Sequence, residues 1–167
     1  DPQLWRRSDL VITTKIFWGG SGVNESGLSL KHCREGLDKC LSRLQLDYVD
    51  LLFCHRPDPH TPTSTVVRSM TQMVRSGRAT AWGTSEWSAQ QITEAVWIAR
   101  ALGLEAPQFE QPQYNLFHRT RVEQEYHPLY RAPYEIGTTI WSPLMSGILT
   151  GKYNDGIPAG SRMTQPG

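Results

Sequence analysis

The segment YVDLLFCHRPDPHTPTSTVVRSMTQMVRSGRATAWGTS (48–85) contains one complete strand-helix-strand unit. Apolar and β-branched residues dominate 48–55 and 79–85, which predicts two short strands. Between them, apolar side chains recur at helical spacing from about Ser64, and Gly77 stands where a helix commonly ends in a left-handed residue. A strand, a helix and a strand in this order predict two parallel strands joined by a right-handed crossover.

Strand-like runs recur on both sides of this unit. They are LVITTK (10–15), PQFEQPQY (107–114) and TTIWSPL (138–144). Helical patterns follow each of the first four strands, so the chain alternates strand and helix throughout. This order is typical of an α/β protein and predicts a (β/α)8 TIM barrel.

Capping residues place the other helices. The three further helices predicted are 29–44, 88–103 and 120–131. Ser29 precedes the first of them, and Ser88 with Gln91 forms a capping box before the second. Pro128 must kink or end the third, because proline has no amide hydrogen to donate to the preceding turn.

The length of the chain limits how much of a barrel it can form. A complete barrel takes about 250 residues, whereas this chain has 167. The last predicted strand leads into a Gly/Pro-rich stretch, 154–167, without a helical pattern. We therefore expect an internal fragment of a larger barrel, with about five strands and four helices.

Composition narrows the classes of function. The chain has 17 basic and 16 acidic residues and no basic cluster, so neither nucleic acid nor an anionic membrane is indicated as a partner. No apolar stretch approaches the roughly 18 residues of a membrane span, and the N-terminus lacks a signal-peptide pattern. We expect a soluble cytoplasmic protein. Cys33, Cys40 and Cys54 lack metal-binding spacing, which predicts core thiols in a reducing compartment and no metal site.

Charged side chains stand at two predicted strand ends, where the active sites of barrels lie. Lys15 ends the first strand and His55 ends the second. An ammonium in a low-dielectric pocket lowers the pKa of a neighbouring acid, so the pair favours acid-base chemistry. Alone, the lysine could equally be a surface charge and the histidine a structural residue. Lys152 and Arg162 in the last loop could clamp a phosphate or simply be solvated.

Uncharged polar groups and one aromatic residue stand at the remaining strand ends. Ser85, Gln111 and Ser142 supply hydroxyl and amide groups, and Trp141 adds a large flat ring. An indole offers stacking area while polar groups fix orientation, so this set suits a planar polar ligand such as nicotinamide. The alternative is that Trp141 only fills the core.

Several segments, in fixed order, resemble one known family. They are LVITTKIFWGG (10–20), RLQLDYVDLLFCHRPDP (43–59), WGTSEWS (82–88), EQPQYN (110–115) and WSPLMSGILTGKYNDGIP (141–158). Together they closely resemble the aldo-keto reductase superfamily, and within it the branch of the voltage-gated potassium channel beta subunits and related reductases. The resemblance implies a β/α barrel that binds NADPH across the strand ends. It also implies that 1–167 is a partial domain lacking the first two β/α units and the C-terminal strand and helices.

The resemblance gives roles to the strand-end residues. Lys15 and His55 correspond to two members of the Asp-Tyr-Lys-His catalytic tetrad. Ser85 and Gln111 correspond to the pair that hydrogen-bonds the nicotinamide carboxamide, and Trp141 to the residue that stacks on its ring. The tetrad Asp and Tyr precede the strand that opens this chain, and none of its six tyrosines matches the proton donor. The isolated chain is therefore expected to reduce no carbonyl.

The resemblance also assigns the remaining cofactor contacts. The residues implied to wrap the pyrophosphate are Ser142, Pro143, Leu144 and Ser146. Lys152 and Arg162 resemble the pair that grips the adenosine 2′-phosphate. Two cations facing that phosphate would favour NADPH over NADH.

Two functions follow from the resemblance. The first is an NADPH-dependent reductase of small aldehydes or ketones; the second is a cytosolic potassium channel beta subunit that binds NADPH as a redox sensor. Channel-associated animal members tend to carry asparagine in place of His55, so the histidine favours the reductase. They carry arginine in place of Glu86, and we assign Glu86 no binding role. The branch often forms tetramers, so this protein could form a homo-oligomer. Under the second function it could also bind a channel partner.

Overall fold

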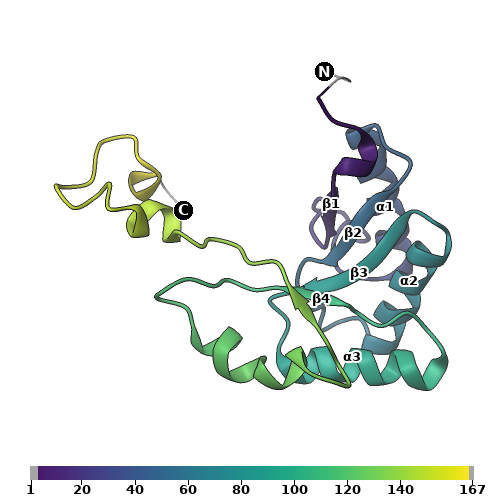
Figure 1. Ribbon diagram of the computed structural model, residues 1–167. Coiled ribbons are helices and arrows are strands. Elements are labelled where there is room, and N and C mark those ends of the chain that lie inside the picture. Colours follow the sequence, from purple (N-terminus) through teal and green to yellow (C-terminus); the bar gives the residue numbers. More distant parts are fainter. Residues whose placement is uncertain (1–3, 166–167) are drawn as a thin grey trace.

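The computed structural model describes residues 4–165, and within them the chain forms one parallel sheet with helices on one face (Figure 1). The strands follow the order β1-β2-β3-β4-β5, so neighbours in the sheet are neighbours in the sequence. Their bounds are β1 Thr13–Ile16, β2 Val49–Cys54, β3 Ala79–Ser85, β4 Phe109–Gln111 and β5 Gly137–Thr138. The α/β class and the sequential parallel order predicted from sequence are confirmed.

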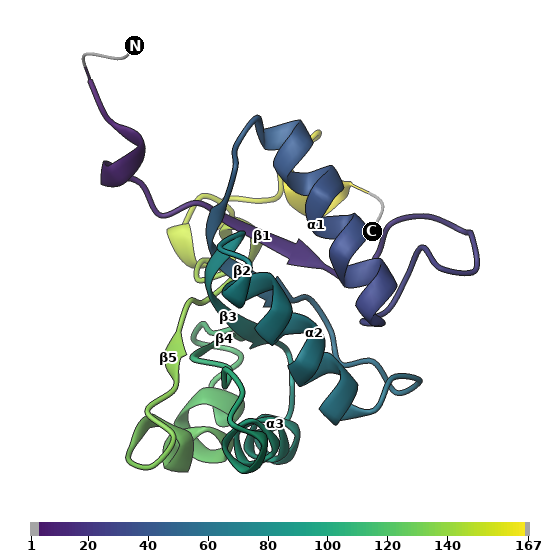
Figure 2. The same ribbon diagram turned by 90° about the vertical axis from the view of Figure 1, so that its right-hand side faces the viewer.

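Three α-helices connect the first four strands and lie side by side along the sheet (Figure 2). They are α1 Leu30–Leu44, α2 Thr63–Arg75 and α3 Ala89–Leu102. Ser29 Oγ accepts a hydrogen bond from the amide of His32, and Ser88 forms the predicted capping box with Gln91. Gly77 and Gly103 adopt left-handed φ angles of 76° and 61° just after their helices. These caps confirm the boundaries expected from sequence.

The expected fourth helix, 120–131, is not one α-helix. The structure has a π-helical turn, η2 (Arg121–Glu125), followed by a 3-10 helix, η3 (His127–Tyr130). Pro128 lies in the first turn of η3, where its missing amide hydrogen costs no helical hydrogen bond. The proline therefore divides this segment.

The expected fifth strand, 138–144, was too long. The β5 strand ends at Thr138, and beyond it Trp141 makes only an isolated parallel bridge with Gln113. Left-handed φ angles at Ser142 and Ser146 are incompatible with continued pairing. Short 3-10 helices were also missed at η1 (Arg7–Asp9), η4 (Met145–Thr150) and η5 (Arg162–Thr164). The first strand begins at Thr13 rather than at Leu10.

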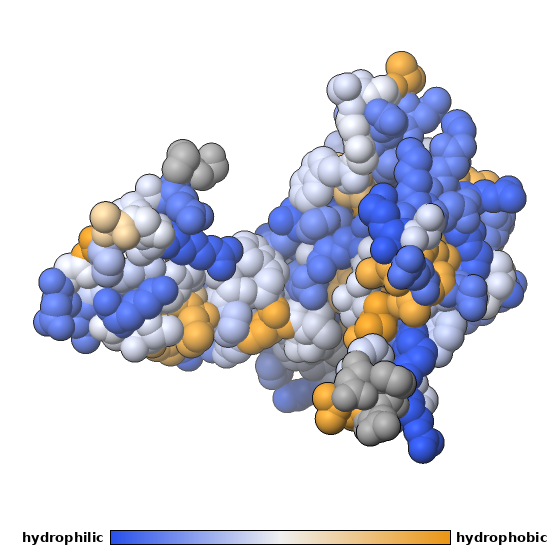
Figure 3. All heavy atoms as spheres, turned by 90° about the horizontal axis from the view of Figure 1, so that it is seen from above, coloured by the Kyte–Doolittle hydropathy of each residue, from blue (hydrophilic) through white to orange (hydrophobic). Residues whose placement is uncertain are grey.

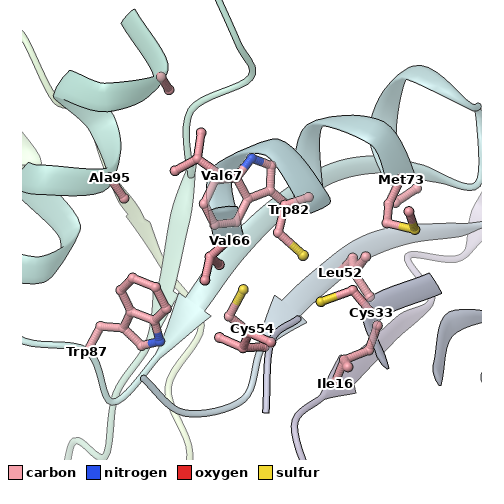
Figure 4. Packing of buried hydrophobic residues seen from close by; sticks show 14 of the residues in the cluster. Ile16, Cys33, Leu52, Cys54, Val66, Val67, Met73, Trp82, Trp87 and Ala95 are labelled. Carbon is pink, nitrogen blue, oxygen red and sulfur yellow. The ribbon is translucent and has the colours of Figure 1, made fainter. Parts of the chain in front are cut away.

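The main core lies between the sheet and the helices (Figure 4). Leu52 and Trp82 point from neighbouring strands towards Val66 and Met73 of α2, and all four are almost completely buried. The Trp82 indole donates a hydrogen bond of 2.9 Å to the carbonyl oxygen of Glu105, so its polar atom is satisfied. On the opposite face of the sheet, a smaller buried cluster consists of Phe53, Ala81 and Phe109.

The three cysteines are free thiols. Cys33 and Cys54 are fully buried in the core, as predicted. Burial raises the pKa of the Cys33 thiol to about 12 and also raises that of Cys54. Cys40 was expected in the core as well, but it is only half-buried, with its sulfur 3.3 Å from a guanidinium nitrogen of Arg43. It lines a pocket together with Gly36 and with Ile16 of β1, at the edge of the sheet.

No helix within residues 4–165 is both long enough and apolar enough to cross a bilayer.

Candidate functional site

The candidate site lies at the C-terminal ends of the first four strands. Lys15 is the third residue of β1, and its register partner is Phe53, two residues before His55. Ser85 ends β3 and is paired with Gln111, the last residue of β4. Side chains alternate between the two faces of a strand, so these residues project on the face opposite the helices. Polar side chains at the ends of four successive strands therefore lie together on this face of the sheet.

One pocket of about 240 Å³ is lined mainly by residues predicted from the sequence. Its lining residues are Lys15, His55, Arg56, Ser85, Gln111 and Trp141. Five of these six were singled out from the sequence, and Arg56 was not. The pocket is smaller than the roughly 300–1,000 Å³ of a typical drug-sized ligand site. It therefore suits a single ring with a small substituent.

Positive charge dominates the electrostatics of the pocket. Burial, reinforced by the nearby Arg56 guanidinium, lowers the pKa of the Lys15 ammonium. Burial, then Arg56 and Lys15, lower the pKa of His55 from 6.5, so its imidazole is neutral at pH 7. No carboxylate lines this pocket within residues 4–165. The positive charges of the pocket would stabilise a bound substrate oxygen atom that gains negative charge during a reaction.

An aromatic residue and a guanidinium that sequence reasoning missed flank the histidine. The rings of Trp18 and His55 meet edge to face, with centroids 4.6 Å apart and an angle of 71° between their planes. The Arg56 guanidinium carbon lies 5.4 Å from the centre of the Trp18 ring. Their positions in the sequence could have indicated a place in the site, because Arg56 directly follows His55 and Trp18 follows the end of β1 by two residues.

Hydrogen bonds within the chain fix the polar groups of the pocket. The Ser85 hydroxyl donates to the Gln111 carbonyl oxygen at 2.9 Å and accepts from Arg56 at 3.4 Å. The Gln111 side-chain nitrogen donates to the Thr139 hydroxyl at 3.1 Å. Within the described part of the chain, no donor is bonded to the Gln111 amide oxygen. That oxygen is thus oriented and available to a ligand.

A carboxylate holds the Trp141 side chain. The Glu86 carboxylate accepts hydrogen bonds from the Trp141 indole N–H at 2.8 Å and from the Gln113 amide at 2.6 Å. About a third of the Trp141 side chain is exposed, at 37%. The alternative that Trp141 only fills the core does not hold, because a core tryptophan would be buried. Glu86 was given no role from the sequence.

The remaining predicted cofactor residues lie outside this pocket. Ser142, Pro143, Leu144 and Ser146 begin the segment that leaves the sheet after β5 and projects as a separate lobe (Figure 3). Lys152 and Arg162 are exposed on the same lobe, where η4 and η5 contact each other. The structure therefore separates a ring-sized pocket from a lobe that carries two exposed cations, and a short stretch of chain joins them.

Backbone strain marks the junction between pocket and lobe. Glu86, Ser142, Met145 and Ser146 all adopt left-handed φ angles, between 45° and 58°. Such conformations cost of order 1 kcal/mol or more for residues other than glycine and concentrate at functional sites. Their gathering around Trp141 supports a binding role for this junction.

The tyrosines of the described segment do not line the pocket. Tyr126 belongs to the main core and Tyr130 packs against it. Burial raises the pKa of both phenols, that of Tyr130 to about 12. A raised pKa is the opposite of what a proton donor requires. Groups of three or more His, Cys, Asp or Glu side chains that could hold a metal ion do not occur within residues 4–165.

A parallel β/α sheet with its polar site at the strand C-termini is the arrangement of β/α-barrel enzymes. A family model described as "Aldo/keto reductase family" matches residues 4–167. The chain therefore belongs to the aldo/keto reductase family, whose fold is a (β/α)8 barrel.

Two relatives extend this finding. The chain is 58% identical over 159 residues to a rice protein and 59% identical over 159 residues to an Arabidopsis thaliana protein. Both are named "Probable voltage-gated potassium channel subunit beta". Each match covers 95% of this chain and 48% of the relative. The chain thus spans about half the length of the curated relatives it matches.

Proposed function

We propose that the protein is an NADPH-dependent oxidoreductase that reduces aldehyde or ketone carbonyls to alcohols. The single observation that best supports this is the shared pocket of Lys15, His55 and Trp141, completed by Ser85 and Gln111. We further propose that 1–167 forms one section of a larger cytoplasmic barrel, because its relatives are about twice as long.

The residues present fit a nicotinamide cofactor. The partly exposed Trp141 residue lines the pocket, and the Gln111 amide oxygen is free to accept a hydrogen bond from a carboxamide. Lys152 and Arg162 would face the 2′-phosphate, and the stretch from Ser142 to Ser146 would meet the pyrophosphate. When bound, NADPH supplies a hydride to the carbonyl carbon.

The residues of this chain orient and polarise the carbonyl. A neutral His55 imidazole donates one N–H to the carbonyl oxygen, and this bond strengthens as the oxygen gains charge. Lys15 and Arg56 add positive potential and stabilise the developing alkoxide. Trp18 against the histidine helps to exclude water from this side of the pocket. The proton itself requires a tyrosine from elsewhere in the polypeptide.

The names of the relatives favour a second candidate. A channel beta subunit would bind NADPH in the same pocket and respond to redox state without rapid turnover. The two candidates differ in catalysis rather than in binding, so a kinetic test separates them.

The test is NADPH oxidation by the full-length protein with a simple aromatic aldehyde. The reductase proposal expects turnover that falls by at least about 100-fold in His55→Ala. His60→Ala is the matched control, because this exposed histidine lies outside the pocket and should leave the rate unchanged. Binding of NADPH without turnover would favour the channel subunit.

A further inference from the structure

Glu86 connects three strand ends at the edge of the pocket. It directly follows β3, its carboxylate accepts from the Gln113 amide just beyond β4, and the same oxygen accepts from the Trp141 indole just beyond β5. We propose that Glu86 is a positioning residue that fixes the Trp141 ring for stacking against a planar ligand. This inference rests on the proposed function, in which that ligand is nicotinamide.

The Trp141 indole is held at its N–H group by a hydrogen bond to Glu86. Trp141 is held at its backbone, where its amide donates to Pro112 at 3.0 Å. A backbone contact does not fix the side-chain torsions, and a residue that is 37% exposed is not held in place by packing alone. The hydrogen bond from the indole to Glu86 removes this freedom. A ring already in place avoids the ordering cost that binding would otherwise include.

The carboxylate is itself well supported. Arg121 approaches its second oxygen at 3.7 Å and donates to the Glu86 carbonyl oxygen at 3.3 Å. Arg121 also lies 3.6 Å from Glu125. A cation beside Glu86 offsets the repulsion that a lone carboxylate would exert on a phosphate-bearing ligand. This explains how an anion is tolerated so close to a cofactor site.

The left-handed φ of 58° at Glu86 aims the side chain towards Trp141. This conformation is costly for a residue other than glycine, and it persists only where surrounding contacts enforce it. The hydrogen bonds to Gln113 and Trp141 and the contacts with Arg121 are those contacts. The strain is thus coupled to the placement of the ring.

The test compares Glu86→Ala with Glu86→Gln in the full-length protein labelled with 5-fluorotryptophan. The fluorine signal of Trp141 is the one missing from Trp141→Phe. Glu86→Ala should shift or broaden this signal before any ligand is added. It should also weaken NADPH binding by up to about tenfold, because binding must then include the cost of ordering the freed side chain. Glu86→Gln keeps an acceptor oxygen and should stay close to the wild type in both measurements.

The matched control is Glu125→Ala, which removes a carboxylate from the same arginine without touching Trp141. It should leave the Trp141 signal and the affinity unchanged. The inference is overturned if Glu86→Ala keeps the wild-type signal and affinity, or if Glu86→Gln loses as much as Glu86→Ala. If the signal moves as expected but the wild type does not bind NADPH, Glu86 still positions the ring and the proposed function fails instead.

Discussion

Replacing Glu110 with glutamine should make the stability of the protein much less sensitive to pH. Glu110 lies on the helix-facing side of β4 and is completely buried. The Thr84 hydroxyl donates to one carboxyl oxygen, and the other has no hydrogen-bond partner within the described residues. Burial raises the pKa of this carboxyl from 4.5 to about 7, despite the opposing hydrogen bond from Thr84.

The sign and size of the effect follow from this pKa. Between pH 4.5 and 7 the folded state holds the Glu110 proton and the unfolded state releases it, so stability falls as pH rises through this window. The difference between a pKa of about 7 and one of 4.5 corresponds to roughly 3 kcal/mol, since one pKa unit is worth about 1.4 kcal/mol. Glutamine does not titrate and removes this dependence.

The assay is thermal unfolding of the full-length protein at pH 5 and pH 8. The fall in Tm between these values should be smaller in Glu110→Gln than in the wild type by about 4 °C, because 1 kcal/mol shifts Tm by roughly 1.5 °C in a protein about twice as long as this chain, at about 2.1 cal/mol/K of unfolding entropy per residue. Any constant cost of burying the amide cancels in this comparison. Glu94→Gln, on an exposed position of α3, is the control. An equal fall in Tm for all three proteins would refute the reasoning.

Three further predictions concern the pocket, the lobe and the sheet. Trp141→Ala should weaken NADPH binding by roughly 1–3 kcal/mol in an equilibrium titration, because a desolvated stacking contact is lost; unchanged affinity would remove Trp141 from the site. Lys152→Ala combined with Arg162→Ala should erase any preference for NADPH over NADH, and a constant ratio of the two dissociation constants would contradict the phosphate assignment. Gly83→Ala should lower Tm by several degrees, because its new Cβ would collide with the ring and backbone of Phe109. A Tm equal to that of the wild type would show that β4 can move aside.

The parts of the fold that follow from local chemistry were predictable. Ser29, Ser88 and Gln91 cap their helices as expected, because a side-chain oxygen that satisfies a free helix amide acts within three residues. The segment after Thr138 was not predictable in the same way. Its apolar residues read as a strand, but the left-handed backbone at Ser142 ends the pairing, and only the folded chain reveals that conformation.

Some residues of the candidate site could likewise be predicted from the sequence, and others could not. Lys15 and His55 could be found because strand ends and barrel topology alone bring them together. Glu86 and Glu110 could not, because each is defined by partners more than 20 residues away in the sequence. The sequence alone does not show whether a glutamate is solvated, accepts a hydrogen bond from an indole, or is buried and protonated. Only the surroundings that the fold creates distinguish these cases.

Hydride transfer into this pocket can be measured directly with NADPH that carries deuterium at the reactive position of the nicotinamide ring. The full-length protein, an aromatic aldehyde and each of the two C4-deuterated epimers in turn would be mixed, and the alcohol product analysed by mass spectrometry. We expect one epimer to give alcohol with a single deuterium on the former carbonyl carbon, and His55→Ala to form it far more slowly. Alcohol without deuterium from both epimers, or no alcohol while NADPH is bound, would contradict the assignment of Lys15, His55 and Trp141 to a carbonyl-reducing site.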